Sequence, residues 1–238
     1  MLVKSSNGVE YECHDWDHSF VTHISIQDPV HNFAVGKERE IIMNLLENRN
    51  KRTFVDVGGH LGFWSLYMSN IFEKVLCFEP NPETFSHLKY NTSKNKNIEL
   101  FNNALGDEDC NVEVLYHIGY NTNPEIEYNS DQRINSGMSR VKKSSEGIKS
   151  FKLDNLEIND LDFIKLDCEG FELMVLKGGE KTIKTNSPII VIETNGLEKT
   201  IFNVEVDEVH NYLTSLGYNR IFHCDEDPGV TSNSIYTI

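Results

Sequence analysis

A glycine turn at residues 55–62, with the sequence VDVGGHLG, is the strongest local sign of ligand binding in this chain. The apolar residues before it predict a buried strand, and the turn would let the backbone approach a ligand where a helix begins. A nicotinamide enzyme would need glycines at positions 60 and 63, where this chain has His60 and Phe63. A turn that binds a cofactor without a pyrophosphate can carry these larger side chains, and S-adenosylmethionine is the obvious candidate. The alternative is a glycine turn that serves packing alone.

Glu79 is a second candidate ligand-binding residue, because it ends the next predicted strand about 20 residues after the glycine turn. An acidic group at that place meets the ribose hydroxyls of an adenosine ligand. Pro80 and Pro82 flank it and stiffen the turn. The alternative is that Glu79 caps the helix that begins near Pro82. The order, the spacing and the strand context together favour the nucleoside-binding interpretation.

A group of acids is expected at the carboxyl ends of two later strands. Asp167 and Glu169 follow one strand, and Glu193 and Asn195 close the next. Ligands bind outside these strand ends in open α/β sheets, so Asp167, Glu169 and Glu193 are candidates for orienting or deprotonating a substrate. Asp167, Glu193 and Asn195 are candidate ligands for a divalent cation such as magnesium. The alternative is a structural network, in which Lys165 shares a face with Asp167 and needs a carboxylate partner.

Alternating strands and helices must position these residues. Apolar runs predict strands at 53–57, 74–80, 98–105, 162–167 and 187–195, with helices at 37–49, 63–72, 83–95, 171–183 and 206–218 between and around them. This alternation predicts a parallel sheet with helices on both faces. Residues 220–224 and 234–238 would add a closing antiparallel pair. We expect a domain over 36–238 and an N-terminal extension over 1–35, whose histidines His14, His18 and His23 match no compact metal motif.

Residues 116–150 form a polar stretch that is rich in Asn, Ser and Gly and poor in apolar periodicity. We expect a loop insertion there, either a plain surface loop or a binding loop that acts as a lid.

Composition narrows the function classes. The 37 acidic and 22 basic residues give a net charge of −15, which disfavours nucleic acid and anionic membranes as partners. No apolar run is long enough to span a bilayer, and the first residues do not look like a signal peptide. Five scattered cysteines without a C-x-x-C pair suggest reduced thiols. We therefore expect a cytoplasmic protein.

The chain resembles the FkbM family of methyltransferases from about residue 33 to 195. The resemblance lies in the strings FVDVGGHLGFWSLYMS, VLCFEPNPETFSHLKYN and DLDFIKLDCEGFELMVLKGGEKTI, followed by SPIIVIETNG. It implies a Rossmann-like seven-stranded methyltransferase sheet, mostly parallel with the last strand antiparallel, and methyl transfer from S-adenosylmethionine to an oxygen. Family substrates include sugars, polyketides and other secondary metabolites.

The resemblance also implies a cofactor site. Asp56, Gly58 and Gly62 match the part that binds the methionine moiety, and Glu79 and Asn81 match the ribose-binding turn. Asn103 and Ala104 match the turn that borders the adenine, and residues 135–139 resemble a loop that closes near the cofactor. The family usually has Ala-Asn where this chain has Gly59-His60. The full expected cofactor set is Asp56, Gly58, Gly59, His60, Gly62, Glu79, Pro80, Asn81, Asn103, Ala104 and Asp167.

These expectations together predict an S-adenosylmethionine-dependent O-methyltransferase that acts on a hydroxyl of a small molecule, with a saccharide or another secondary metabolite as acceptor. Two rival classes stay open. One is a nicotinamide-dependent oxidoreductase on a similar sheet, and the other is a non-catalytic module that binds the cofactor. The acceptor's identity, the need for a metal and the oligomeric state are open at this point.

Overall fold

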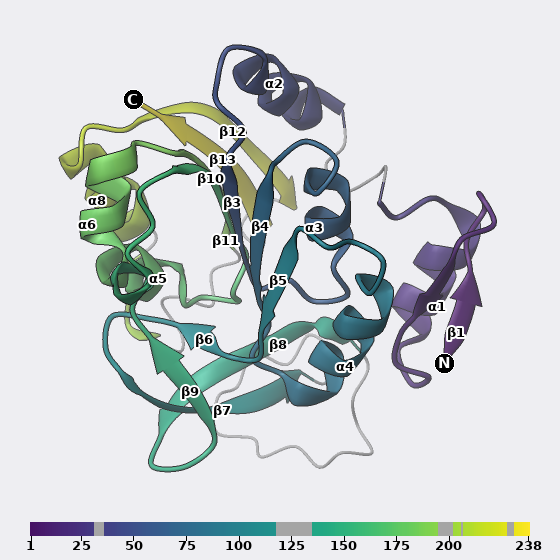
Figure 1. Ribbon diagram of the computed structural model, residues 1–238. Helices are drawn as coiled ribbons and strands as arrows, with labels where there is room; N and C mark the ends of the chain where they lie inside the picture. The colour runs from purple at the N-terminus through teal and green to yellow at the C-terminus, as the bar shows by residue number, and fades with distance from the viewer. Residues whose placement is uncertain (31–35, 118–134, 195–201, 206, 228–230) are drawn as a thin grey trace.

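The computed structural model describes residues 1–30, 36–117, 135–194, 202–205, 207–227 and 231–238, with no account of the side chains of residues 117, 225–227, 231 and 232. Its centre is a seven-stranded sheet in the order β12-β13-β11-β10-β3-β4-β5 (Figure 1). The strands are β3 (Thr53–Val57), β4 (Lys74–Phe78), β5 (Ile98–Phe101), β10 (Leu161–Leu166), β11 (Ile189–Thr194), β12 (Asn219–Asp227) and β13 (Thr231–Thr237). Neighbours from β11 to β5 run parallel, whereas β13 is antiparallel to both β11 and β12. The expected sheet with a closing antiparallel pair is therefore present.

Helices cover both faces of the sheet, as the alternation predicted. Helices α5 (Glu172–Gly178), α6 (Glu180–Asn186) and α8 (Glu208–Ser215) lie on one face (Figure 1). Helices α2 (Gly36–Glu47) and α3 (Phe63–Met68) contribute to the core on the other. Helix α4 (Pro82–Asn91) follows β4. The expected helix at 171–183 is in fact two helices, which meet at Gly179. No helix in the described part of the chain has the length and apolar character needed to cross a bilayer.

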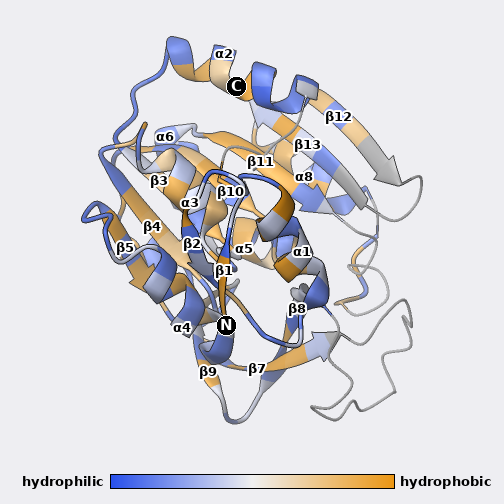
Figure 2. Cartoon of the chain, turned by 90° about the vertical axis from the view of Figure 1, so that its right-hand side faces the viewer, coloured by the Kyte–Doolittle hydropathy of each residue, from blue (hydrophilic) through white to orange (hydrophobic). Residues whose placement is uncertain are grey.

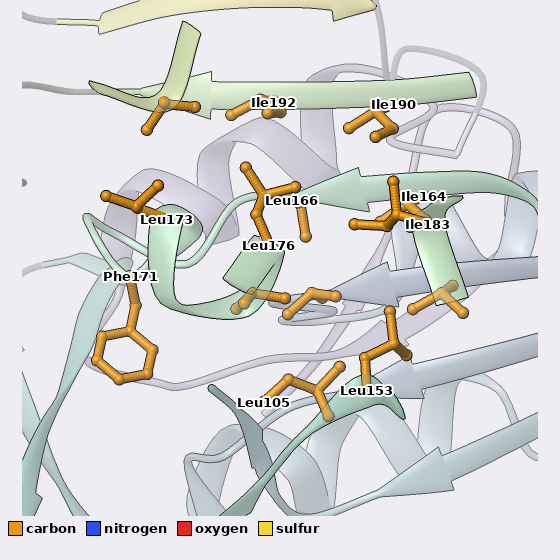
Figure 3. Close-up of a cluster of buried hydrophobic side chains, with 14 of the residues drawn as sticks. Leu105, Leu153, Ile164, Leu166, Phe171, Leu173, Leu176, Ile183, Ile190 and Ile192 are labelled. Carbon is orange, nitrogen blue, oxygen red and sulfur yellow. The ribbon is translucent and has the colours of Figure 1, made fainter. Parts of the chain in front are cut away.

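Strand alternation separates the core into two layers. Val55, Leu76, Ile164 and Ile190 pack toward α5 and α6, and their strand neighbours such as Phe54 pack toward α2 and α3. Figure 3 shows the first layer, where side chains of β10 and β11 meet those of α5 and α6. By the same alternation, Asp56 in β3, Lys165 in β10 and Glu193 in β11 belong to the face of Phe54. Three charged residues thus share one face near the carboxyl ends of three adjacent strands.

A second sheet corrects the expectation of a loop over 116–150. Strands β6 (Ala104–Leu105), β9 (Ile148–Phe151), β7 (Cys110–His117) and β8 (Asn135–Ser144) form a four-stranded sheet in that order. The loop prediction is wrong for 135–144 and 148–150, because polar residues there form ladder hydrogen bonds with β7 that require no apolar periodicity, and residues 118–134 of it lie outside the described residues. The expected strand at 98–105 is also divided, since only 98–101 joins the main sheet.

Glycines bring this second sheet against α5. A Cβ atom added to Gly178 would lie 1.8 Å from the carbonyl oxygen of Gly106, so the two backbones touch there. Leu105 and Val112 from this sheet join the same core as Leu176 of α5.

The N-terminal residues fold as a separate small layer. Strands β1 (Leu2–Lys4) and β2 (Glu10–Glu12) pair antiparallel, and helix α1 (His18–Ile26) follows. Figure 2 faces this layer and shows α1 beside the end of β8. The side chain of Asn91 in α4 bonds to backbone groups of both Glu12 and Leu61, and so joins this layer to the rest of the chain.

Candidate active site

A cavity of about 390 Å³ lies at the carboxyl ends of the central strands. Its lining comes from the glycine turn at 57–61, the start of α3 at 63–64, the end of β4 at 78–80, the start of the second sheet at 103–105, strand β8 at 135–141, the end of β10 with the segment after it, and Glu193 of β11. Three residues of the N-terminal layer, Phe20, His23 and Pro29, complete the wall. The volume falls in the usual range of small-molecule sites, about 300–1,000 Å³.

The glycines of the turn are required by packing. Gly58 has φ 81°, and an added Cβ would lie 1.8 Å from the carbonyl oxygen of Asp167. An added Cβ on Gly59 would lie 2.1 Å from the Sγ atom of Cys77, and one on Gly62 would lie 2.7 Å from Leu88. Each contact is too short for a side chain, so the turn sits directly against β4, β10 and α4. The packing explanation thus accounts for the glycines, and the tight fit also puts the turn's backbone in the cavity wall.

Lys165 lies at the centre of the charged residues. Its Nζ atom donates to the carbonyl oxygen of Gly58 at 3.0 Å and to Asp167 Oδ2 at 2.9 Å, and it lies 3.8 Å from Asp56 Oδ1. Burial acts to lower the pKa of Lys165, but the charges of Asp167 and Asp56 outweigh it and raise that pKa above its usual value. The expected pairing of Lys165 with a carboxylate is therefore present.

Asp56 is fully buried behind the glycine turn. Its Oδ2 atom accepts a hydrogen bond from Ser65 Oγ of α3 at 2.6 Å. Asp56 does not line the cavity, and its contacts are with Lys165 and with Ser65 of α3, so its expected contact with the cofactor stays a prediction.

Glu79 is a buried carboxylate at the end of β4, with 7% of its surface exposed. Its Oε2 atom accepts from the backbone N–H of His60 at 2.9 Å, and its Oε1 atom accepts from the N–H of Asn81 at 2.8 Å. Burial raises the pKa of Glu79 to about 7. The cap of α4 is Asn81, whose Oδ1 atom accepts from the N–H of Glu83, so the alternative role of Glu79 as the helix cap is not observed.

The three acids proposed for catalysis, Asp167, Glu169 and Glu193, all line the cavity. Glu169 stands in a tight turn with φ 55°. Glu172, which the sequence analysis missed, holds this turn, since its Oε1 atom accepts from the N–H groups of Cys168 and Gly170. The signal was an acid directly after the turn, at the first residue of a helix.

The structure gives no support to a divalent cation. Within the described ranges, no three His, Cys, Asp or Glu side chains come together as a metal site would require. Asn195, the third expected ligand, lies outside the described residues.

Hydrogen bonds join Asp17, Ser136 and His60 beside the cavity, and the sequence analysis missed these connections. Asp17 Oδ1 caps α1 by accepting from the N–H of Phe20, and its Oδ2 atom accepts from both the N–H and the Oγ of Ser136, each at 2.6 Å. Ser136 Oγ also lies 2.7 Å from His60 Nε2. The ring of Phe20 packs on His60 with the centroids 4.5 Å apart. The sequence held one signal for this arrangement. Asp17 directly precedes α1, which is typical of an N-cap residue.

The structure thus brings most of the expected site residues to one cavity. Gly58, Gly59, His60, Glu79, Pro80, Asn103, Ala104 and Asp167 line it, together with Glu169 and Glu193. Asp56, Gly62 and Asn81 do not line it and support the turns behind it. The contacts of these residues with a cofactor stay predictions.

Comparisons with known proteins find methyltransferases among the relatives of this chain. The chain is 28% identical over 162 residues to the hexuronic acid methyltransferase AglP of Haloferax volcanii, covering 65% of this chain and 61% of that protein. It is 25% identical over 147 residues to Methyltransferase 1 of Beauveria bassiana, covering 52% of this chain and 57% of that protein. The chain therefore spans less than two thirds of the length of these curated relatives.

Solved structures show the same fold. The FkbM methyltransferase of Methylobacillus flagellatus KT matches 98% of this chain and 63% of its own, with a TM-score of 0.50 and 17% identity. SMU.1697c of Streptococcus mutans, a putative methyltransferase in complex with SAH, matches 86% of this chain and 100% of its own, with a TM-score of 0.51 and 10% identity. The methyltransferase FkbM domain itself matches residues 56–220. That match covers more than half of the sequence, and the chain belongs to the FkbM methyltransferase family.

Proposed function

We propose that this protein transfers a methyl group from S-adenosylmethionine to a hydroxyl oxygen of a small molecule, with a saccharide as the first acceptor to test. The observation that carries this proposal is the shared cavity, which is lined by the glycine turn, the buried Glu79 and the acids Asp167, Glu169 and Glu193. Family membership supports methyl transfer. The name of the hexuronic acid methyltransferase relative supports a sugar acceptor.

The residues of the cavity fit the proposed cofactor. Glu79 uses two of its lone pairs on backbone N–H groups, and a carboxylate offers about four, so two ribose hydroxyls can still donate to it. Phe78 and Leu105 give the neighbouring wall an apolar surface suited to an adenine ring. The backbone of Gly58 and Gly59 would border the methionine part.

When bound, S-adenosylmethionine supplies an electrophilic methyl group, so the protein has to align the acceptor oxygen and receive its proton. Asp167 already accepts a hydrogen bond from Lys165, which suits it to orientation. Glu169 and Glu193 are the candidates to take the proton, because they line the same cavity at the ends of β10 and β11. We propose that these carboxylates act directly on the hydroxyl, without a metal ion between them.

Calorimetry with S-adenosylhomocysteine tests the cofactor assignment. We expect micromolar or tighter affinity, which corresponds to about −8 kcal/mol or better. Glu79→Ala should weaken binding by about 1.5–3 kcal/mol, the usual contribution of hydrogen bonds to a charged group. Glu99→Ala is the matched control, since Glu99 is exposed and paired with Lys74 on the surface.

Two other outcomes would favour the rival classes. Saturable binding of NAD without binding of S-adenosylhomocysteine would exclude a methyltransferase. Tight binding of S-adenosylhomocysteine without methyl transfer to any of a broad set of hydroxyl compounds would favour a non-catalytic module.

A further inference from the structure

Residues 13–30, here called the N-terminal segment, lie outside the part of the chain that matches the family domain, residues 56–220. Phe20, His23 and Pro29 of this segment nevertheless line the cavity. One wall of the proposed active site therefore comes from a part of the chain that the family match does not describe.

Asp17 fixes this segment to the second sheet. Its side chain is fully buried, and its two oxygens bond α1 on one side and Ser136 of β8 on the other. A buried carboxylate that loses its partners is strongly destabilising, so the position of α1 against β8 is well defined.

The hydrogen bonds that join Asp17, Ser136 and His60 have a fixed direction of donation. The carboxylate of Asp17 only accepts, so the Ser136 hydroxyl donates to it. The Ser136 oxygen must then accept the Nε2–H of His60. A neutral imidazole has one N–H group, which leaves Nδ1 as an acceptor. Burial, together with the nearby His14 and Lys165, lowers the pKa of His60 to about 3, so the ring is neutral at pH 7.

Phe20 and His60 form a joint surface on the cavity wall. Their rings pack 4.5 Å apart at 54°, and Gly137 leaves room for Phe20, because an added Cβ there would lie 3.1 Å from its ring. An aromatic face suits the C–H face of a sugar ring, and an acceptor nitrogen beside it suits a hydroxyl donor. Glu79 and Asn103, which are expected to hold the cofactor, belong to other segments of the lining, and the backbone N–H of His60 bonds to Glu79, so the joint surface borders the expected cofactor site.

We propose that the N-terminal segment completes the acceptor site: Phe20 packs against the acceptor's ring, and His60, held as the Nε2–H tautomer by Ser136 and Asp17, accepts a hydrogen bond from an acceptor hydroxyl through Nδ1. This inference rests on the proposed function, since it assumes a hydroxylated acceptor. His60 is a positioning residue here, and the acids at the strand ends receive the proton.

Nuclear magnetic resonance on labelled protein loaded with S-adenosylhomocysteine tests the tautomer and the contact together. The ¹⁵N spectrum of His60 should show a protonated Nε2 and an unprotonated Nδ1. Titration with 4-nitrophenyl glucoside or 4-nitrophenyl glucuronide should shift the Nδ1 and Phe20 signals saturably. A protonated Nδ1, or no shift at either residue with both glycosides, would overturn the proposal.

Variants separate the acceptor site from the cofactor site. Phe20→Leu should weaken glycoside binding about tenfold through the lost ring contact, while the affinity for S-adenosylhomocysteine stays the same. Ser136→Ala keeps the backbone bond to Asp17 but removes the partner of His60, so His60 should lose its single tautomer. Ile26→Ala is the control on the same helix, because Ile26 is 70% exposed, and it should change none of these quantities.

Different results would contradict the proposed function and the proposed acceptor site. A wild-type protein that does not bind S-adenosylhomocysteine contradicts the proposed function. A protein that binds it, but whose Phe20→Leu variant binds the glycosides as the wild type does, contradicts the acceptor site alone.

Discussion

The two sides of the cavity are built by different means. On the side of β3, β4 and β10, the main chain of the glycine turn takes part in the connections: Gly58 packs against the carbonyl of Asp167, and the N–H of His60 donates to the carboxylate of Glu79. On the side of α1 and β8, side chains make the connections, through Asp17, Ser136 and the ring of Phe20. The first side lies within the matched family domain, whereas α1 precedes it.

From this difference we expect one part of the site to tolerate few substitutions and the other to tolerate more. Backbone contacts exclude most substitutions at the glycine turn, so its shape is kept as long as the fold is kept. Side-chain contacts can be exchanged for others of similar size and polarity. We therefore expect the side of β3, β4 and β10 to hold the cofactor and the acids that act on the acceptor hydroxyl, and the side of α1 and β8 to hold the rest of the acceptor.

Replacing the acids proposed for catalysis should have the largest effect, and it tests whether the two sides of the cavity serve different purposes. Glu169→Gln or Glu193→Gln should lower kcat by about 100-fold, the usual scale for loss of a positioned acid–base group, while the affinity for S-adenosylhomocysteine stays nearly unchanged. Activity should also persist in EDTA if the acids act directly. Full activity of both variants on a verified acceptor would make the acids structural, and loss in EDTA with recovery in magnesium would assign them to a cation instead.

The pH dependence of cofactor binding tests whether Glu79 binds the ribose hydroxyls in its ionised form. Its pKa is raised to about 7 by burial, and ribose hydroxyls donate best to the ionised form. Binding should therefore strengthen as pH rises through 7, by about tenfold between pH 6 and pH 8. Calorimetry at several pH values would measure this slope. The Glu79→Gln variant should lose it, and an unchanged slope in that variant would assign the proton to another group.

A substitution at the opposite edge of the sheet, far from the cavity, should not change activity. Asp162 accepts hydrogen bonds from the N–H, Nε and Nη2 groups of Arg52, near the amino ends of β3 and β10. Asp162→Ala should lower the free energy of unfolding by about 1–2 kcal/mol, since Arg52 is partly exposed and the pair is screened. Urea denaturation measures that loss. The KM and kcat of the folded variant should equal those of the wild type, and a large change in either would show that the sheet transmits strain to the site.

Sequence patterns predicted the central sheet well because its signals are local. The apolar run at 53–57 became β3 with the same bounds, and the helical spacing of Ile42 and Leu46 placed α2. Lys165 and Asp167 were expected on one face from strand alternation alone, and they form an ion pair. In each case the pattern and the partner lie within a few residues or in adjacent parallel strands.

The second wall was missed because its partners are far apart in the chain. Ser136 lies 119 residues from Asp17 and 76 from His60, and no spacing rule joins them. Strand β8 was expected as part of a loop, because its polar residues lack a period of two, and its pairing with β7 determines its conformation. The burial of Asp56 behind the turn, with Ser65 as its partner, was also not readable from the sequence, because Ser65 belongs to the next helix.

The contact between Gly178 and Gly106 bears on how such an enzyme can acquire new acceptors. It places main chain against main chain where the four-stranded sheet meets α5, and Val141 of β8 packs into the same core. Cavity residues on β8 such as Met138 and Ser139 can therefore drift or be redesigned while the strand keeps its place. A library that varies these two positions and Phe20, and leaves both glycines intact, is the natural starting point for changing acceptor preference.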